Sequence, residues 1–126
     1  MIEKLLSSPS YDGSKMLLDV AIQRQQAIAS NLANIETPGY KRIEVDKGFS
    51  KVFAQAMNAG APLGTPVPKV LTDYDSPSQR KDGNNVILQD ELMAMSKNSA
   101  EYEALGDFVS YSMRILRMAI TGRSNV

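Results

Sequence analysis

The chain has 126 residues, and its 14 basic and 14 acidic side chains cancel to a formal net charge of zero. This length allows one domain, and the charge balance provides no electrostatic footprint for nucleic acid or an anionic membrane. The absence of cysteine and histidine excludes disulfides, zinc sites built on these ligands and histidine-dependent catalytic triads. We therefore expect no metal and no cofactor.

The first residues, 1–13, are expected to form a turn-rich lead-in. They lack the apolar core and the small-residue cleavage site of a secretory signal. No stretch of the chain approaches 18 apolar residues, so we expect no membrane span. If the protein leaves the cytoplasm, we expect it to do so without a cleaved signal peptide.

A first long helix is predicted over residues 14–36. Ser10, Asp12 or Ser14 could cap its start. The apolar spacing alternates steps of three and four, as in a heptad seam with one polar position. The seam residues are Leu18, Ala21, Gln25, Ile28, Leu32 and Ile35.

The end of this helix carries an unusual pair of asparagines, Asn31 and Asn34, which share one helix face. Pro38 disfavours a helical residue before it, and Pro38-Gly39 suits the centre of a type II turn. Two interpretations stay open. The amides are solvated at an ordinary helix end, or Asn31, Asn34 and Thr37–Tyr40 form a recognition patch.

Residues 37–85 are expected to be the turn and a long, irregular, proline- and glycine-rich insert. One amphipathic helix is predicted over about residues 47–58, with Gly60 as its stop. Residues 65–72 read as extended chain or one short strand.

A second long helix is predicted over residues 86–122, with Asn84 or Asn85 as its cap and Gly122 as its stop. Its apolar stripe alternates steps of four and three, and it is broader than a two-helix seam requires. The stripe residues are Leu88, Leu92, Met95, Ser99, Tyr102, Gly106, Val109, Met113, Leu116 and Ile120, widened by Leu105, Phe108, Ile115 and Ala119.

These elements predict a mainly α fold with a single domain over residues 1–126, of which 123–126 are a tail. The two long helices are expected to pair as an antiparallel coiled-coil hairpin, joined by the irregular insert with its one short helix. Such a pair leaves apolar surface uncovered, and a two-helix layer must bury that surface against something. We therefore expect self-assembly or a dedicated partner.

The only catalytic candidates are two carboxylate pairs, Asp73 with Asp75 and Glu101 with Glu103. Residues two apart on a helix point away from each other, and a proline-rich loop supplies no cleft. We interpret both pairs as solvated surface, so the chain is not expected to be an enzyme. A carboxylate hydrolase would require a cleft around two acids.

Two segments resemble a known family. Residues 29–40, with both asparagines and Thr37-Pro38-Gly39-Tyr40, resemble the N-terminal signature of bacterial flagellar rod and hook proteins. Residues 82–86, followed by Glu91, Asn98, Tyr102 and Leu105, resemble the C-terminal region of the proximal rod proteins. The short chain favours the proximal members, because distal rod and hook proteins carry larger inserted domains.

The resemblance implies a structural subunit of the flagellar basal-body rod, exported by the type III apparatus and placed in the periplasmic rod. Its implied partners are other copies of itself, other rod proteins, the rod–ring adapter, and the inner-membrane ring with the export gate. The alternative is a soluble helical binding module or an export partner. The residues expected to contact other subunits are Asn31, Asn34, Thr37, Pro38, Gly39, Tyr40, Leu18, Ile28, Leu32, Leu92, Met95, Tyr102, Val109, Met113, Leu116 and Ile120.

Overall fold

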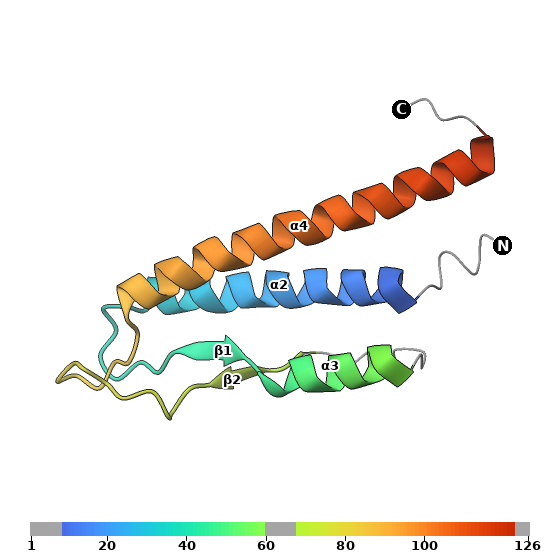
Figure 1. Ribbon diagram of the computed structural model, residues 1–126. Helices are drawn as coiled ribbons and strands as arrows, with labels where there is room; N and C mark the ends of the chain where they lie inside the picture. Colours follow the sequence, from blue (N-terminus) through green and yellow to red (C-terminus); the bar gives the residue numbers. More distant parts are fainter. Residues whose placement is uncertain (1–8, 60–67, 123–126) are drawn as a thin grey trace.

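A computed structural model of the chain describes residues 9–59 and 68–122 (Figure 1). Three helices and two short strands occur in these ranges. In chain order they are α2 (Pro9–Ala33), β1 (Ile43–Val45), α3 (Gly48–Ala59), β2 (Val70–Thr72) and α4 (Leu88–Thr121).

Helix α2 starts earlier than the sequence indicated, so the proposed caps Asp12 and Ser14 lie inside it. It ends at Ala33, and a turn follows. The Tyr40 N–H donates to the Thr37 carbonyl at 3.3 Å, and Gly39 has a φ of 71°. The predicted turn around Pro38-Gly39 is therefore present, with glycine at the position that needs a positive φ.

The described parts of the insert, residues 37–59 and 68–85, contain a small sheet besides the expected short helix, which corrects one part of the predicted fold. Strands β1 and β2 form an antiparallel pair in which Glu44 lies opposite Leu71, and α3 follows β1 where the short helix was expected. Gly60, proposed as the stop of α3, lies outside the described residues. Regular structure forms because α2 offers the insert an apolar surface to pack on.

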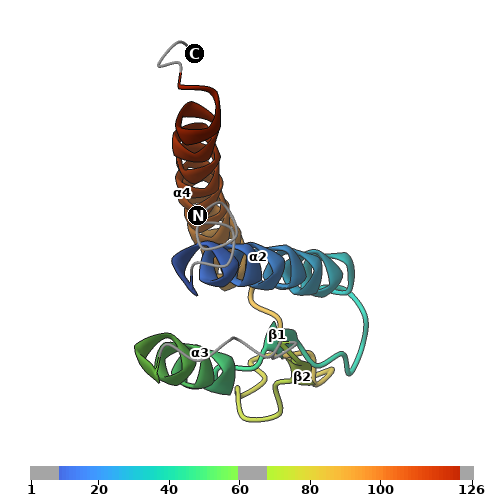
Figure 2. The same cartoon turned by 90° about the vertical axis from the view of Figure 1, so that its right-hand side faces the viewer.

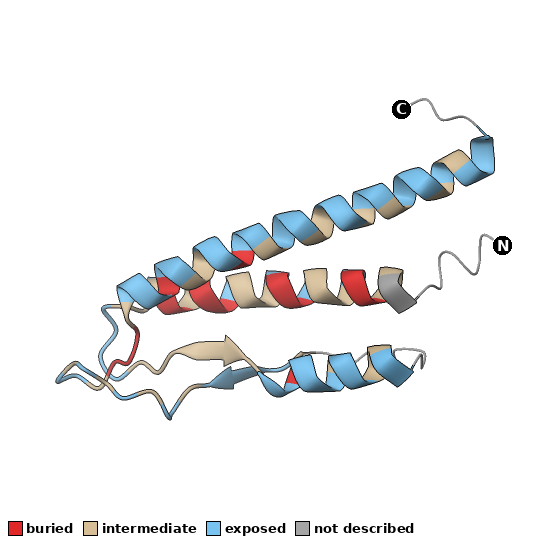
Figure 3. Ribbon diagram, in the orientation of Figure 1, coloured by how far each residue is buried: buried red, intermediate tan, exposed pale blue. Residues whose placement is uncertain are grey.

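The core lies along α2, which is the middle layer of the molecule. Figure 2 shows α4 on one side of α2, and α3 with the two strands on the other. Figure 3 shows that most buried positions fall on α2. The buried apolar side chains are Val20, Ala21, Ala27, Ile28, Phe49 and Val86.

The predicted antiparallel coiled-coil hairpin is wrong. In Figure 1, α4 rises away from α2 toward its C-terminus. Leu92, Tyr102 and Ile120 are 43%, 46% and 57% exposed, so they do not form a closed seam. The physical reason is that α4 diverges from α2 and is tied to it by buried polar side chains, Asn31 with Glu91 and Asn98 with the Ala21 carbonyl, rather than by a continuous apolar seam.

Of the two predicted end residues of α4, the C-terminal stop is confirmed and the N-terminal cap is wrong. Gly122 ends the helix with a φ of 62°, and its N–H donates to the Met118 carbonyl at 2.9 Å. At the start, Ile87 is the cap residue and makes no side-chain capping bond. Asn84 and Asn85 therefore do not cap α4. Within residues 9–59 and 68–122, no helix combines the length and hydropathy needed to cross a membrane.

Two helical glycines provide a matched test of the packing of α3 on α2. A Cβ at Gly106 would meet nothing within 4 Å, whereas one at Gly13 would lie 2.9 Å from Met57 Sδ and 3.2 Å from Phe53 Cζ. We predict that Gly106→Ala raises the free energy of unfolding by about 0.5–1 kcal/mol through helix propensity. Gly13→Ala should gain less, because α3 must shift. Urea unfolding followed by circular dichroism measures both, and an equal gain would contradict the packing.

Candidate functional site

Two asparagine pairs that lie far apart in the sequence meet at one corner of the fold. We call Asn31, Asn34, Asn84 and Asn85, with the turn at residues 37–40, the asparagine corner. It joins the end of α2 to the segment that leads into α4. The corner contains the whole of the recognition patch that the sequence suggested, together with Asn84 and Asn85.

Asn84 closes the end of α2. Its side chain is 1% exposed, and Nδ2 donates to the backbone carbonyls of Asn34, Ile35 and Thr37 at 3.0, 3.1 and 2.9 Å. The last carbonyls of a helix have no partner within the helix, so this amide supplies one from outside. Arg80 also donates to the Ile35 carbonyl. Asn84 was expected to cap the start of α4, but it binds the end of α2 instead.

Asn31 is fully buried, at 0% exposure, and its amide pairs with the backbone of β1. Nδ2 donates to the Ile43 carbonyl at 2.9 Å, and Oδ1 accepts from the Ile43 N–H at 2.8 Å. Nδ2 also donates to Glu91 on α4 at 3.2 Å, and Oδ1 accepts from the Tyr40 hydroxyl at 3.2 Å. One side chain thus joins α2 to β1, to the turn and to α4.

Glu91 leads from this amide to a cluster of charges around Arg42. Its carboxylate is 1% exposed, and Oε1 lies 3.0 Å from Arg42 Nε. Arg42 Nη1 also lies 2.8 Å from Glu44 and 3.0 Å from Asp73. Burial alone would lower the pKa of the Arg42 guanidinium, but the hydrogen bonds to Glu44, Glu91 and Asp73 raise it above its ordinary value.

Asp73 is part of this cluster rather than solvated surface, which corrects the sequence interpretation. Its side chain is 8% exposed and accepts hydrogen bonds from the Ser76 hydroxyl at 2.6 Å and from the backbone of Asp75 and Ser76. The pKa of Asp73 is lowered mainly by the Ser76 hydroxyl and also by Arg42, although burial opposes the shift. The carboxylate therefore fixes the loop after β2 instead of acting as a catalytic acid.

Asn85 and a pair of glycines complete the corner. Asn85 Oδ1 accepts from the Arg42 N–H at 2.7 Å, and Nδ2 donates to the Asp73 carbonyl at 2.8 Å. Gly39 and Gly83 have φ of 71° and 82°, and a Cβ on Gly83 would lie 3.8 Å from Gly39 Cα. Two glycines in the left-handed conformation, one after α2 and one before α4, therefore lie close together.

The residues of the suggested patch thus differ in exposure. Asn31 faces inward, whereas Thr37, Pro38 and Gly39 are exposed. Asn34 and Tyr40 lie between these extremes. Their expected contact with another subunit stays a prediction, and the exposed turn is the part that a partner can reach directly.

A second polar contact joins α2 to α4 near the middle of both helices. Asn98 is 2% exposed; Nδ2 donates to the Ala21 carbonyl at 2.9 Å and to Gln25 at 3.1 Å. Arg24 Nη1 donates to Asn98 Oδ1 and forms a 2.6 Å ion pair with Glu101. Gln25, the polar position in the predicted seam, is therefore bonded to α4.

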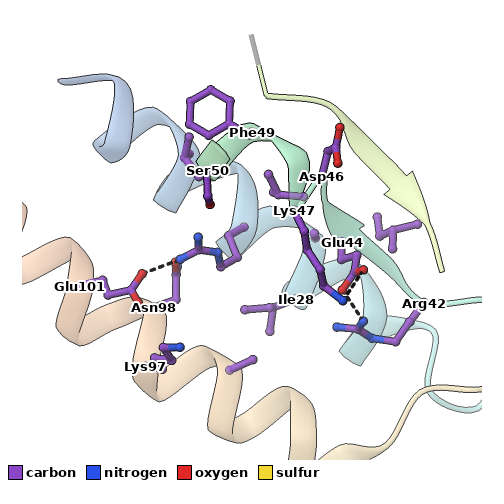
Figure 4. Close-up of a pocket in the computed structure, with 16 residues that line it drawn as sticks. Ile28, Arg42, Glu44, Asp46, Lys47, Phe49, Ser50, Lys97, Asn98 and Glu101 are labelled. Atoms are coloured by element: carbon purple, nitrogen blue, oxygen red, sulfur yellow. Dashed lines mark hydrogen bonds and ion pairs between the residues drawn. The ribbon is translucent and has the colours of Figure 1, made fainter. Parts of the chain in front are cut away.

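A groove of about 440 Å³ lies beside this contact, between α2, α4 and the segment from β1 to α3 (Figure 4). Two of its carboxylates form ion pairs, Glu44 with Arg42 and Lys47, and Glu101 with Arg24. A third, Asp46, accepts a hydrogen bond from the Gly48 N–H. Among residues 9–59 and 68–122 no group of acidic side chains has the arrangement to hold a metal ion. The groove is thus lined by apolar side chains such as Val20, Ala27 and Ile28 and by charged side chains, most of which form ion pairs.

The other residues expected to contact subunits differ in exposure. Leu92, Tyr102, Met113 and Ile120 are exposed, Ile28 is buried, and Leu18, Leu32, Met95, Val109 and Leu116 are partly covered. A second apolar side of α4 combines Phe108 and Ile115, which were expected to widen the predicted stripe, with Tyr111, which the sequence did not single out. Phe108, Tyr111 and Ile115 are 46%, 57% and 39% exposed.

The burial of Asn31 generates a first prediction for the site. Removing its amide in Asn31→Ala leaves the Ile43 N–H and carbonyl without a partner and takes one hydrogen bond from Glu91, whose Oε1 still pairs with Arg42. We expect a loss of about 2–4 kcal/mol in the free energy of unfolding. The control Asn34→Ala removes bonds of a partly exposed side chain and should cost about 1 kcal/mol or less. Equal losses in urea titrations would argue against the buried role.

Asp73 generates a pH prediction. Because its pKa is lower in the folded chain than its unfolded value of about 3.9, its stabilisation is present above that value and is lost as the pH falls through the folded pKa. We expect Asp73→Asn to lower stability at neutral pH and to flatten the acid limb of a plot of unfolding free energy against pH. The control is Asp75→Asn, whose side chain is exposed. An unchanged acid limb in Asp73→Asn would contradict the assignment.

Comparison with known proteins adds independent information. Residues 21–41 match the family described as flagella basal body rod protein. The flagellar basal body rod protein FlgB of Aeromonas hydrophila is 32% identical over 117 residues, which cover 83% of this chain and 87% of the relative. FlgB of Bacillus subtilis is 28% identical, with 89% and 96% covered. FlgB of Escherichia coli is also 28% identical, with 100% and 96% covered. The chain therefore belongs to the flagellar basal body rod protein family, alongside these FlgB proteins.

Proposed function

We propose that this chain is a structural subunit of the proximal rod, which assembles through exposed apolar surface into the tubular drive shaft of the flagellum. The family is one of structural rod components of the flagellar basal body. The proposal concerns how the subunits assemble and which surfaces are in contact.

The observation that carries this proposal is the second apolar face of α4. Phe108, Tyr111 and Ile115 are spaced by three and four residues, so they share one side of the helix. Asn98, which bonds to α2, lies on a different side of the helix. Monomeric soluble proteins rarely leave such contiguous apolar surface uncovered. A neighbouring subunit that packs on this face would remove it from water.

The asparagine corner supports the same role in another way. Its buried amides and ion pairs fix the angle between α2, the turn and the start of α4, so the exposed Thr37-Pro38-Gly39 turn is presented on a rigid base. A repeating assembly requires that each subunit offer the same surface in the same orientation. We propose that this turn contacts an adjacent subunit or the rod–ring adapter.

The proposed setting is the periplasmic part of the basal body, reached by type III export. The neighbours are other copies of the chain, other rod proteins, and the inner-membrane ring with the export gate. A soluble helical binding module or export partner is the alternative. It would act before the basal body is complete and would not be recovered within it.

Charge substitutions on two sides of α4 test the proposal. In a flagellated strain that carries this chain as its only copy, Phe108→Glu should abolish swimming and rod incorporation, because a buried carboxylate would lie in the subunit contact. Ser110→Glu, on another side of the same helix turn, should leave both intact. Circular dichroism of the purified variants should show equal helicity. Normal incorporation of Phe108→Glu into isolated basal bodies would overturn the proposal and favour the export-partner alternative.

A further inference from the structure

Within residues 9–59 and 68–122, no backbone group pairs with the outer edge of β2. In the described sheet β1 and β2 are the only two strands, and the Asp73 N–H donates to the Arg42 carbonyl at 2.8 Å at one end of the pair. Hydrogen-bonded positions alternate along an antiparallel ladder. The backbone N–H and carbonyl of Leu71 therefore point toward β1, whereas those of Val70 and Thr72 point to the opposite edge. Such an edge is a template for another strand.

The opposite edge of the sheet is closed. The Asn31 amide donates to the carbonyl and accepts from the N–H of Ile43 in β1, in the manner of a neighbouring strand. A strand that joins the described sheet can therefore add only beside β2. The fold protects one of its two edges and leaves the other open.

The side chains of β2 are also uncovered. All three residues of the strand are exposed, with Val70 at 45% and Leu71 at 46%, and Tyr74 beyond its end is 77% exposed. Natural edge strands are commonly protected by short length, charged residues, proline or bulges, and the short length applies to β2, which has three residues. Here Val70, Leu71 and Thr72 include no charge and no proline.

The charges that flank the strand favour one kind of occupant. Lys69 and Asp73 lie two residues before and two residues after Leu71. In an antiparallel pair of two identical strands centred on Leu71, each Lys69 lies opposite Asp73 of the second copy, and Val70 lies opposite Thr72. This register uses the outward-pointing backbone groups of Val70 and Thr72. A parallel pair would set like charges against each other.

The electrostatics of the Arg42 cluster favour the same register. One guanidinium serves three carboxylates, those of Glu44, Asp73 and Glu91, so the cluster has an excess of negative charge. Lys47 reaches Glu44 but is 83% exposed. Lys69 of a second copy would bring a further cation toward Asp73. The β2 edge is thus complementary to itself in charge as well as in backbone pattern.

We propose that the chain pairs with a second copy of itself through the outer edge of β2, as an antiparallel two-fold contact centred on Leu71. The contact extends the two-stranded sheet to four strands. Because a two-fold contact closes on itself, it yields a dimer and cannot propagate along a helical shaft. The pairing therefore belongs to the chain before its incorporation, and it does not depend on the α4 face proposed for assembly.

Cysteine cross-linking tests the register, since the chain has no cysteine of its own. Leu71→Cys places two thiols opposite each other at a spacing that a disulfide tolerates. The more exposed Tyr74 lies six residues from its opposite position, so the two thiols of Tyr74→Cys would be about 20 Å apart. We expect Leu71→Cys to form the disulfide-linked dimer at least about tenfold faster than Tyr74→Cys in the purified full chain. Equal rates would overturn the register.

Two double variants test the contact without a disulfide. Val70→Lys with Thr72→Glu sets opposite charges across the antiparallel pair, whereas Val70→Lys with Thr72→Lys sets like charges. Both alter the same two exposed positions, so folding of the monomer should be affected similarly, as circular dichroism can verify. We expect sedimentation equilibrium to give about tenfold tighter dimerisation for the Lys/Glu variant. Equal affinities, or a wild-type chain that stays monomeric at all concentrations, would overturn the proposal.

Discussion

The fold depends on one demand: the Asn31 amide, which is fully buried, must be completely hydrogen-bonded. A buried polar group without partners costs about 1–3 kcal/mol, and four groups from three parts of the chain meet this side chain. Ile43 supplies a donor and an acceptor, Tyr40 supplies a hydroxyl, and Glu91 supplies a carboxylate. Satisfying the amide therefore sets the positions of β1, the turn and the start of α4 at once.

Glu91 links the Asn31 amide to the charged side chains of the corner, because it must also be hydrogen-bonded and charge-paired. A buried carboxylate requires a charge partner and hydrogen bonds, and Arg42 provides both at 3.0 Å. Arg42 in turn holds Asp73, which orders the loop after β2. The polar groups form a connected network, so the removal of one member leaves several others unsatisfied. This explains why a neutral chain with few aromatic residues has a defined angle between its elements.

The same polarity leaves α4 with apolar surface for other uses. Helices α2 and α4 are joined by the Asn31–Glu91 and Asn98–Ala21 contacts. Much of the apolar stripe of α4 is therefore left unburied by α2. The buried apolar side chains of α2 are Val20, Ala21, Ala27 and Ile28, and Phe49 of α3 is buried as well. The faces of α4 that carry Phe108 and Tyr102 remain exposed. An internal contact made of amides and ion pairs thus preserves hydrophobic surface for subunit packing.

Local signals in the sequence determined the long helices, the turn at Pro38-Gly39 and the stop at Gly122, because spacing, proline and glycine act over a few residues. The asparagine-turn motif also indicated the rod family. Tertiary structure alone decided where the polar side chains point. Asn84 was expected to cap α4 and instead closes α2, and Asp73 was expected in solvent and instead binds Arg42. The hairpin was wrong for the same reason: periodicity reports that a helix has an apolar face, but only the packed structure determines which element, if any, covers it.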